Sequence, residues 1–211
     1  MGKRASSLPN MVITLLIITI IAGGSLGFVF QLTKEPIAAA KLLKQQEAIK
    51  EVVPGFDNNP GEEAYELTSE EGFILKVFPA KKEGTLIGVA IESMTNRGFG
   101  GDIKVMVGLK PDGTLVNYKV LEHHETPGLG TKMTDWFKTD KGKQSIVGKN
   151  PGQSNLTVSK DGGEVDAITA ATISSRAFLH AIEVAYSTYT QKADASSSAT
   201  TQTHNEEGDQ Q

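Results

Sequence analysis

The run of residues from 72 to 121 decides the fold, because four short apolar segments follow one another in it. These segments are GFILKVF (72–78), TLIGVAIE (85–92), DIKVMVGL (102–109) and TLVNYKVL (114–121). Aliphatic and β-branched runs of this length, bounded by turn residues, are typical of strands. Pro-Asp-Gly at 111–113 is a strong turn between the last two segments. Because successive segments are joined by short links, we expect antiparallel pairing.

Helical patterns precede and follow these strands. Apolar residues in 35–53 recur at helical spacing among Lys and Glu. Pro36 suits the first turn of such a helix, and Pro54-Gly55 ends it. A second helix is expected from Thr172 to about Tyr189, with its apolar residues mainly on one side. The order of helix, strands, loop and helix predicts the α+β class, with an antiparallel sheet and flanking helices.

Residues 11–30 (MVITLLIITIIAGGSLGFVF) form an uncharged apolar segment. A helix of this length can cross a hydrocarbon core of about 30 Å. Lys3 and Arg4 precede the segment, whereas Lys34 and Glu35 cancel after it, which favours a cytoplasmic N-terminus. A cleaved signal peptide is the alternative interpretation. The segment is longer than the usual apolar region of about 7–15 residues in a signal peptide, which favours an uncleaved anchor in the plasma (inner) membrane.

These patterns divide the chain into five parts. A cytoplasmic N-terminus (1–10) is followed by a transmembrane helix (11–30), a stalk helix (31–55), an extracytoplasmic domain (56–190) and a tail (191–211). From residue 193 on, the tail has no large apolar residue and is rich in Ser, Thr, Gln and acidic residues. This composition predicts that the tail is disordered.

The composition excludes several kinds of chemistry. The 211 residues include no Cys, which excludes disulfides, thiolate metal sites and thiol catalysis. The net charge is −4, and basic residues form only short Lys clusters. Since nucleic-acid binding depends on basic patches, we expect no nucleic-acid partner.

The loop at 165–176 (VDAITAATISSR) enters the second predicted helix with small and hydroxyl residues. Thr169, Thr172 and Ser174 supply hydroxyls, and Ala171 keeps the backbone accessible. A helix start offers unpaired N–H groups and the positive end of the helix dipole, which suits a phosphate. Ser and Thr also cap helix N-termini routinely. The residues alone therefore leave both an anion site and a capping cluster open.

A second group of polar residues follows the last predicted strand, in His123-His124-Glu125-Thr126-Pro-Gly128-Leu129-Gly130. Neighbouring side chains of an extended segment point to opposite faces, so the two His and Glu125 form a poor shared metal site. The spacing also lacks a helical ligand pattern, and we predict no metal site. The Thr-Pro-Gly-Leu-Gly part is a stiff turn whose glycines permit close backbone approach.

The segment Asp166-Ala-Ile-Thr169-Ala-Ala171-Thr172 resembles the Asp-Gly-x-Ser/Thr-Gly-Ala-Thr signature of FMN-binding domains. In those domains a flavin transferase links the phosphate of FMN to a Thr hydroxyl as a phosphodiester. The resemblance implies that Thr172 is the acceptor, that Asp166, Thr169 and Ala171 complete the cofactor site, and that Ser174 is a second available hydroxyl. Ala170 stands where the signature usually has Gly.

Two further segments resemble the G subunits of Rnf-type electron-transport complexes. They are Glu125–Gly130 and GFGGDIKVMVG at 98–108, and they occur in the family's order, between a membrane helix and the flavin signature. A related family contains the C subunits of the Na⁺-translocating NADH:quinone reductases. The resemblance implies that Glu125, Thr126, Gly128 and Leu129 lie near the flavin. Glu125 could instead fix its loop through hydrogen bonds.

By this resemblance, the chain is a membrane-anchored subunit that relays electrons through covalent FMN. Rnf-type complexes couple electron transfer between ferredoxin and NAD to the movement of Na⁺ or H⁺, so the partners implied are the other subunits of the complex and, for maturation, a flavin transferase. The chain has no catalytic residues of its own in this interpretation. Alternatives are an anchored extracytoplasmic module that binds an anion reversibly, without covalent flavin, and a stand-alone flavoprotein reductase.

Four other residues allow two interpretations each. Trp136 and Phe137 suit a core better than a flavin-stacking position. Phe99, among glycines, would serve the flavin or a partner if it is exposed. Arg176, just after the signature, would either pair with the phosphate of FMN or belong to a solvated helix face.

Overall fold

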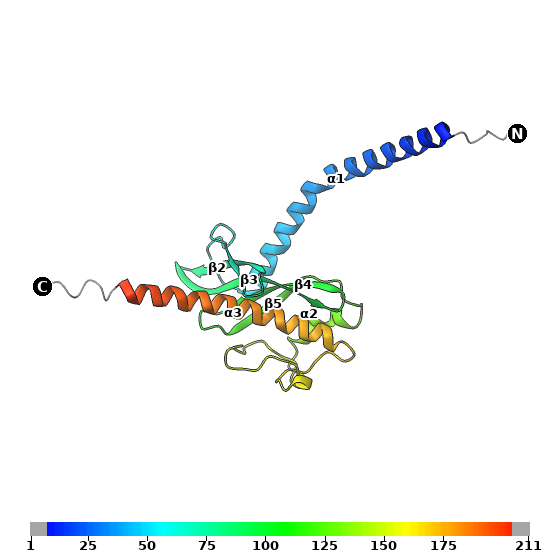
Figure 1. Cartoon of the computed structure of the whole chain (residues 1–211). Helices are drawn as coiled ribbons and strands as arrows, with labels where there is room; N and C mark the ends of the chain where they lie inside the picture. Colours follow the sequence, from blue (N-terminus) through cyan, green and yellow to red (C-terminus); the bar gives the residue numbers. More distant parts are fainter. Residues whose placement is uncertain (1–7, 204–211) are drawn as a thin grey trace. The chain divides into compact units, whose positions relative to one another are not determined.

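A five-stranded sheet with the order β1-β2-β3-β4-β5 is the centre of the domain (Figure 1). The computed structural model describes residues 8–203, with side chains described through Lys192. Every neighbouring pair of strands is antiparallel, which confirms the predicted sheet and the α+β class. The strands are β1 (Tyr65–Thr68), β2 (Ile74–Lys82), β3 (Thr85–Gly98), β4 (Gly101–Leu109) and β5 (Leu115–Glu122).

The strands differ clearly from the expected segments at three places. β2 continues to Lys82, beyond the expected end at residue 78. β1 lies outside the four predicted segments, since its sequence YELT is too short to show a periodic pattern. β3 continues to Gly98, beyond the expected end at residue 92. This extension brings β3 directly into the turn that contains Phe99.

One face of the sheet packs against helix α3 (Thr172–Thr203), as Figure 1 shows. Val77, Ile91, Val107 and Tyr118 are register partners along one row across β2 to β5, and all are fully buried. On the α3 side, Phe178 meets the Tyr118 ring edge-on, with ring centroids 4.7 Å apart. The alternation of the strands thus provides a continuous apolar layer for the helix.

The opposite face packs against the last turns of helix α1 (Leu8–Val52). Buried Ala48, Ile49 and Val52 form a cluster with residues of β2, β3 and β4, among them Phe78 and Met106. A Cβ at Gly108 would lie 2.1 Å from the Val52 carbonyl oxygen, so only glycine permits this close approach. The sheet therefore has a helix on each face, as predicted.

Residues up to Lys44 and residues from Gln45 on form two compact units. Within the described residues, α1 is the one helix long and apolar enough to cross a membrane. α1 is continuous through Pro36, whereas the sequence predicted a separate stalk helix beginning there. Proline removes a single backbone N–H donor, and good helix formers on both sides continue the helix. That the transmembrane part of α1 ends at residue 30 and the stalk begins at residue 31 stays a prediction.

The C-terminal helix also differs from its expected length. α3 continues to Thr203, past the expected end near Tyr189, because no Gly or Pro interrupts residues 172–203. The prediction that the tail at 191–211 is disordered stays a prediction. Residues 204–211 lie outside the described residues, as do residues 1–7 with Lys3 and Arg4.

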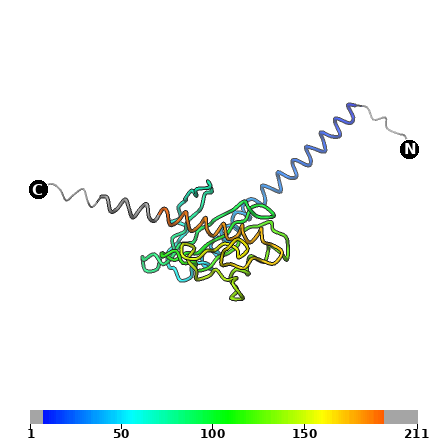
Figure 2. Tube along the Cα trace, turned by 60° about the horizontal axis from the view of Figure 1, so that its bottom comes forward, coloured from blue at the N-terminus to red at the C-terminus, as the bar shows by residue number. Residues whose placement is uncertain are grey.

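Long loops connect β5 to α3 and contain only short helical turns. These are η1 (Gly130–Lys132), α2 (Met133–Trp136) and η2 (Ser159–Asp161). Figure 2 shows the yellow part of these loops running beside the first turns of α3. Phe137 anchors them in the core, where its ring stacks on Phe178 with centroids 4.7 Å apart, which confirms the core interpretation for Phe137.

Candidate functional site: a cleft at the start of helix α3

A cleft of about 340 Å³ opens beside the first turn of α3. Three separate segments form it: the β3–β4 turn, the loop after β5 and the loop that enters α3. Phe99 comes from the first, Glu125 and Leu129 come from the second, and Thr172 from the third. The complete lining consists of Phe99, Glu125, Thr126, Leu129, Gly130 and residues 170–174.

A tight turn sets the start of α3. The Ala171 N–H donates to the Ile168 carbonyl at 2.9 Å, and Ala170 has a φ of +62°. Left-handed backbone at this position of a turn favours glycine. The Gly that is usual in the flavin signature thus has a physical reason, and Ala170 takes the same conformation at the cost of strain.

The hydroxyls of the signature have different roles. Ser175 Oγ is buried, accepts the Ile168 N–H at 2.9 Å and donates to the Ala171 carbonyl at 2.9 Å. Ser174 Oγ is also buried and donates to Glu125 Oε2 at 2.5 Å. Thr172, by contrast, is half-buried and lines the cleft. Ser175 therefore does not cap α3 but ties the loop before the helix to its first turn. Thr172 is the more accessible of the two candidate acceptors.

Glu125 is buried, with an exposed fraction of 5%, and its carboxylate joins all three segments of the cleft. Oε1 accepts the Gly100 N–H of the β3–β4 turn at 3.0 Å, and Oε2 accepts the hydroxyl of Ser174 in α3. A Cβ at Gly98 would lie 2.7 Å from Oε1, and one at Gly130 would lie 2.6 Å from Oε2. The Glu125 carboxylate fits here because Gly98 and Gly130 have no side chain that would clash with it.

Asp166 does not line the cleft but holds the loops that precede α3. Its Oδ2 accepts the Lys143 N–H at 3.0 Å, and its Oδ1 accepts the Ser159 hydroxyl at 3.0 Å. The Lys143 N–H and then the Ser159 hydroxyl keep the pKa of Asp166 below its usual value. The Asp166 carbonyl also accepts Trp136 Nε1–H at 2.9 Å, which places Trp136 among structural contacts.

The structure therefore brings together six of the nine residues predicted for the cofactor site: Glu125, Thr126, Leu129, Ala171, Thr172 and Ser174. Asp166, Thr169 and Gly128 do not line the cleft. Thr169 is exposed, and the Gly128 N–H donates to Thr131 Oγ1 at 3.0 Å within the loop.

Four lining residues are not among the nine predicted for the site: Phe99, Gly130, Ala170 and Ile173. For Phe99 the sequence left a role toward the flavin or a partner open. For Gly130 and Ala170 the available signal was the place of each residue in a segment with a family resemblance: Gly130 in residues 125–130 and Ala170 in residues 166–172. Ile173 has an exposed fraction of 49% and follows Thr172 directly. The available signal in the sequence was its place between Thr172 and Ser174, two residues predicted for the site.

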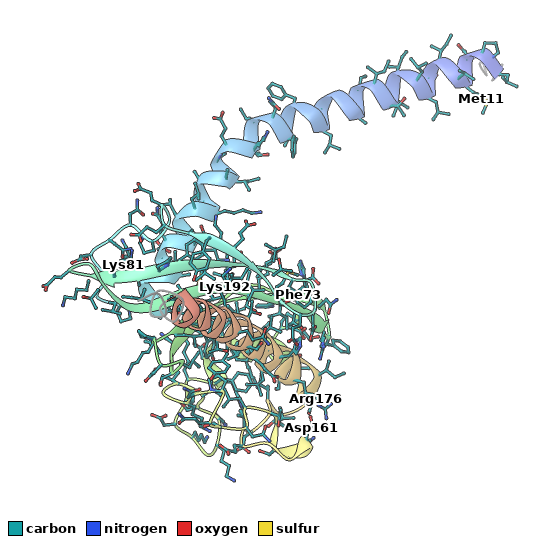
Figure 3. All side chains as sticks on the ribbon, turned by 60° about the vertical axis from the view of Figure 1, so that its left-hand side comes forward. Met11, Phe73, Lys81, Asp161, Arg176 and Lys192 are labelled. Atoms are coloured by element: carbon teal, nitrogen blue, oxygen red, sulfur yellow. The ribbon has the colours of Figure 1, made fainter. Side chains whose placement is uncertain are left out.

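Arg176 forms a bidentate pair with Asp161, and both nitrogen–oxygen distances are 2.7 Å (Figure 3). Asp161 raises the pKa of Arg176, and Arg176 lowers that of Asp161. Arg176 is absent from the lining of the cleft, so a pairing with a phosphate there has no support. Among the described residues, no group of three or more acidic, His or Cys side chains could hold a metal ion.

The sheet, the cleft and the apolar helix define an α+β domain with a small-molecule cleft, preceded by a helix long and apolar enough to cross a membrane. Residues 98–187 match the FMN-binding domain family. The G subunit of the ion-translocating oxidoreductase complex of Haemophilus influenzae Rd is 38% identical over 173 residues, which cover 78% of this chain and 80% of the relative. The corresponding G subunits of Photorhabdus laumondii and Escherichia coli K12 are each 33% identical, over 81% and 79% of this chain and 85% and 84% of the relatives. The chain belongs to this family of Rnf-type G subunits.

The cleft fits FMN by its size and its lining. Its volume lies within the range of about 300–1,000 Å³ usual for small-molecule sites. Three apolar side chains around Thr172 are accessible: Phe99, Ile173 and Leu129 have exposed fractions of 69%, 49% and 38%. Apolar walls suit an aromatic ring system, and the start of a helix suits a phosphate.

Proposed function

We propose that this chain is a membrane-anchored electron-carrying subunit of an Rnf-type complex, with FMN bound covalently through a phosphodiester to Thr172. In this proposal the flavin supplies one-electron transfer, and the complex couples electron transfer between ferredoxin and NAD to ion translocation. The observation that carries the proposal is that half-buried Thr172 lines an apolar cleft in an FMN-binding domain.

The contacts of the neighbouring hydroxyls support Thr172 over Ser174 as the acceptor. Ser174 is only 2% exposed and donates its hydroxyl to Glu125. Its modification would break this buried hydrogen bond, which leaves a charged acceptor without its partner and costs about 1–3 kcal/mol. Thr172 lines the cleft at the first residue of α3, where backbone N–H groups are available to a phosphate.

The residues around Thr172 have distinct parts in binding. Phe99, Leu129 and Ile173 would contact the aromatic ring system and exclude water from it. No Lys or Arg lines the cleft within the described residues, so the start of α3 would be the main positive group for the phosphate. Attachment by the phosphate leaves the ring unmodified, so its surroundings set its properties.

The proposal includes a location and partners. α1 would anchor the chain in the plasma membrane with the N-terminus in the cytoplasm, the domain on the outer side and a flavin transferase there for maturation. The relatives are named as subunits of an ion-translocating oxidoreductase complex, which supports other subunits of such a complex as partners.

The test is the intact mass of the full-length protein, isolated in detergent from cells that contain a flavin transferase. We expect an added mass of FMN less one water, and flavin fluorescence that survives denaturation. Thr172→Ala removes both, whereas Ser174→Ala and Thr169→Ala, the matched hydroxyl controls, retain them. An unmodified wild-type protein contradicts the proposal, and a ligand that is lost on denaturation favours reversible anion binding instead.

A further inference from the structure

Glu125 is the only charged residue that lines the cleft within the described part of the chain. Its nearest polar partners are a backbone N–H and a hydroxyl, not a cation. A ring bound against Phe99 and Leu129 would thus have a carboxylate in its immediate surroundings that no Lys or Arg neutralises.

This carboxylate has a fixed position. Both oxygens accept hydrogen bonds, from Gly100 at 3.0 Å and from Ser174 at 2.5 Å. Gly98 and Gly130 close around it, so that even one added methyl group would lie within 2.7 Å of a carboxylate oxygen. Glu125 therefore cannot turn out of the cleft toward water without breaking its hydrogen bonds to the β3–β4 turn and to α3.

The partners of Glu125 are next to the residues that would bind the flavin. Gly100 follows Phe99, and Ser174 is two residues after Thr172 on the same helical turn. Leu129 belongs to the loop of Glu125 itself. One carboxylate thus holds two apolar walls of the cleft in place relative to the acceptor.

We infer that Glu125 is a positioning residue for the flavin and that its fixed negative charge lowers the reduction potential of the flavin. The inference rests on the proposed function. Reduction adds negative charge to the ring, and a nearby carboxylate disfavours that charge in a site that water enters poorly. The hydroxyl of Ser174 offsets part of this effect, because it donates to the carboxylate.

The experiment is a spectroelectrochemical titration of the full-length flavinylated protein. Glu125→Gln keeps the size of the side chain and removes its charge. We expect a positive shift in potential, on the order of tenfold in the equilibrium constant for uptake of one electron, which equals about 59 mV. The matched control is Glu183→Gln, which makes the same change in net charge at an exposed position of α3. Glu183 is eleven residues from Thr172, or about 16 Å of helix rise, so we expect a much smaller shift.

Ser174→Ala gives a second, opposite test. Without the hydroxyl, the charge of Glu125 is less neutralised, and we expect the potential to move in the negative direction. A purely structural role would loosen the cleft in both variants and would not produce shifts of opposite sign. If Glu125→Gln does not fold or does not carry FMN, Ser174→Ala decides alone, and an unchanged or more positive potential overturns the inference.

Intact mass separates this inference from the proposed function. A wild-type protein without the FMN adduct overturns both. A wild-type protein with the adduct, together with a Glu125→Gln variant whose potential equals that of wild type, overturns the inference and leaves the proposed function intact.

Discussion

Glu125, in the loop after β5, and Asp166, in the loop that enters α3, both have carboxylates that stabilise their loops, but in different ways. Glu125 is buried, lines the cleft and forms hydrogen bonds across it to the β3–β4 turn and to α3. Asp166 is partly exposed and bonds away from the cleft, to Lys143 and Ser159. Both acids belong to segments with a flavin-binding resemblance, yet only one can face a ligand. The place of an acid in a signature therefore does not say whether it contacts the cofactor.

We expect the largest effect on stability from substitutions of the glycines that lie against these two carboxylates, Gly130 beside Glu125 and Gly142 beside Asp166. A Cβ at Gly130 would lie 2.6 Å from both Glu125 Oε2 and Ser174 Oγ, whereas one at Gly142 would lie 3.0 Å from Asp166 Oδ2. We expect Gly130→Ala to lower the free energy of unfolding by about 2–3 kcal/mol, because it overpacks a buried hydrogen-bonded pair. Gly142→Ala should cost about 1 kcal/mol, mainly through its left-handed backbone.

Urea unfolding of both variants checks this difference, with Gly61→Ala as a control. Gly61 has no positive φ, and an added Cβ there would meet one atom at 3.6 Å. Equal losses for Gly130→Ala and Gly142→Ala would show that the two carboxylates are held equally tightly, which contradicts the comparison.

The sheet and the helix on each of its faces could be predicted from the sequence because they depend on periodic burial. Alternating apolar residues in β2 to β5 and the apolar side of α3 determine which faces meet. The strand β1 could not be predicted in this way, since YELT has four residues and only Leu67 among them is buried. The continuation of α1 through Pro36 depends on the helix formers on both sides of it, which the first-turn preference of Pro does not reveal.

The candidate site was only partly predictable, because hydrogen-bond partners distant in sequence decide which side chains face the cleft. Thr172 and Glu125 were found through their segments. The hydroxyl of Ser174 is bound to Glu125 through a hydrogen bond between residues 49 positions apart in the sequence. That Asp166 faces away depends on Lys143 and Ser159, in loops without a periodic pattern. No local signal in the sequence specifies these partners.

A smaller effect is expected at the left-handed residue of each loop. In the Glu125 loop this residue is Gly128, with a φ of +74°, and in the Asp166 loop it is Ala170, with a φ of +62°. We expect Ala170→Gly to raise the free energy of unfolding by about 0.5–1 kcal/mol, because relief of about 1–2 kcal/mol of strain exceeds the added chain entropy of about 0.5–1 kcal/mol.

Ala171→Gly is the matched control for this gain. Ala171 is buried and has no positive φ, so the same substitution should lower the free energy of unfolding by about 0.5–1 kcal/mol. Thermal or urea unfolding measures both. A loss of stability in Ala170→Gly would mean that the methyl group has a stabilising contact that outweighs the strain.

The smallest expected effect is the pH dependence of the Asp166 contacts. The pKa of Asp166 is lowered by the Lys143 N–H and then by the Ser159 hydroxyl, so the folded state favours the ionised carboxylate. The resulting stability is fully present above the unfolded-state pKa of about 3.9 and is lost as the pH falls through the lower folded-state pKa. We therefore expect Asp166→Asn to be less stable than wild type at about pH 7 and to approach wild type at about pH 3. Urea midpoints at both pH values, with exposed Asp140→Asn as a charge control, measure this. If the stability difference between wild type and Asp166→Asn were the same at both pH values, the loops would need the shape of the Asp166 side chain and not its charge. Such a result would contradict an electrostatic role for Asp166.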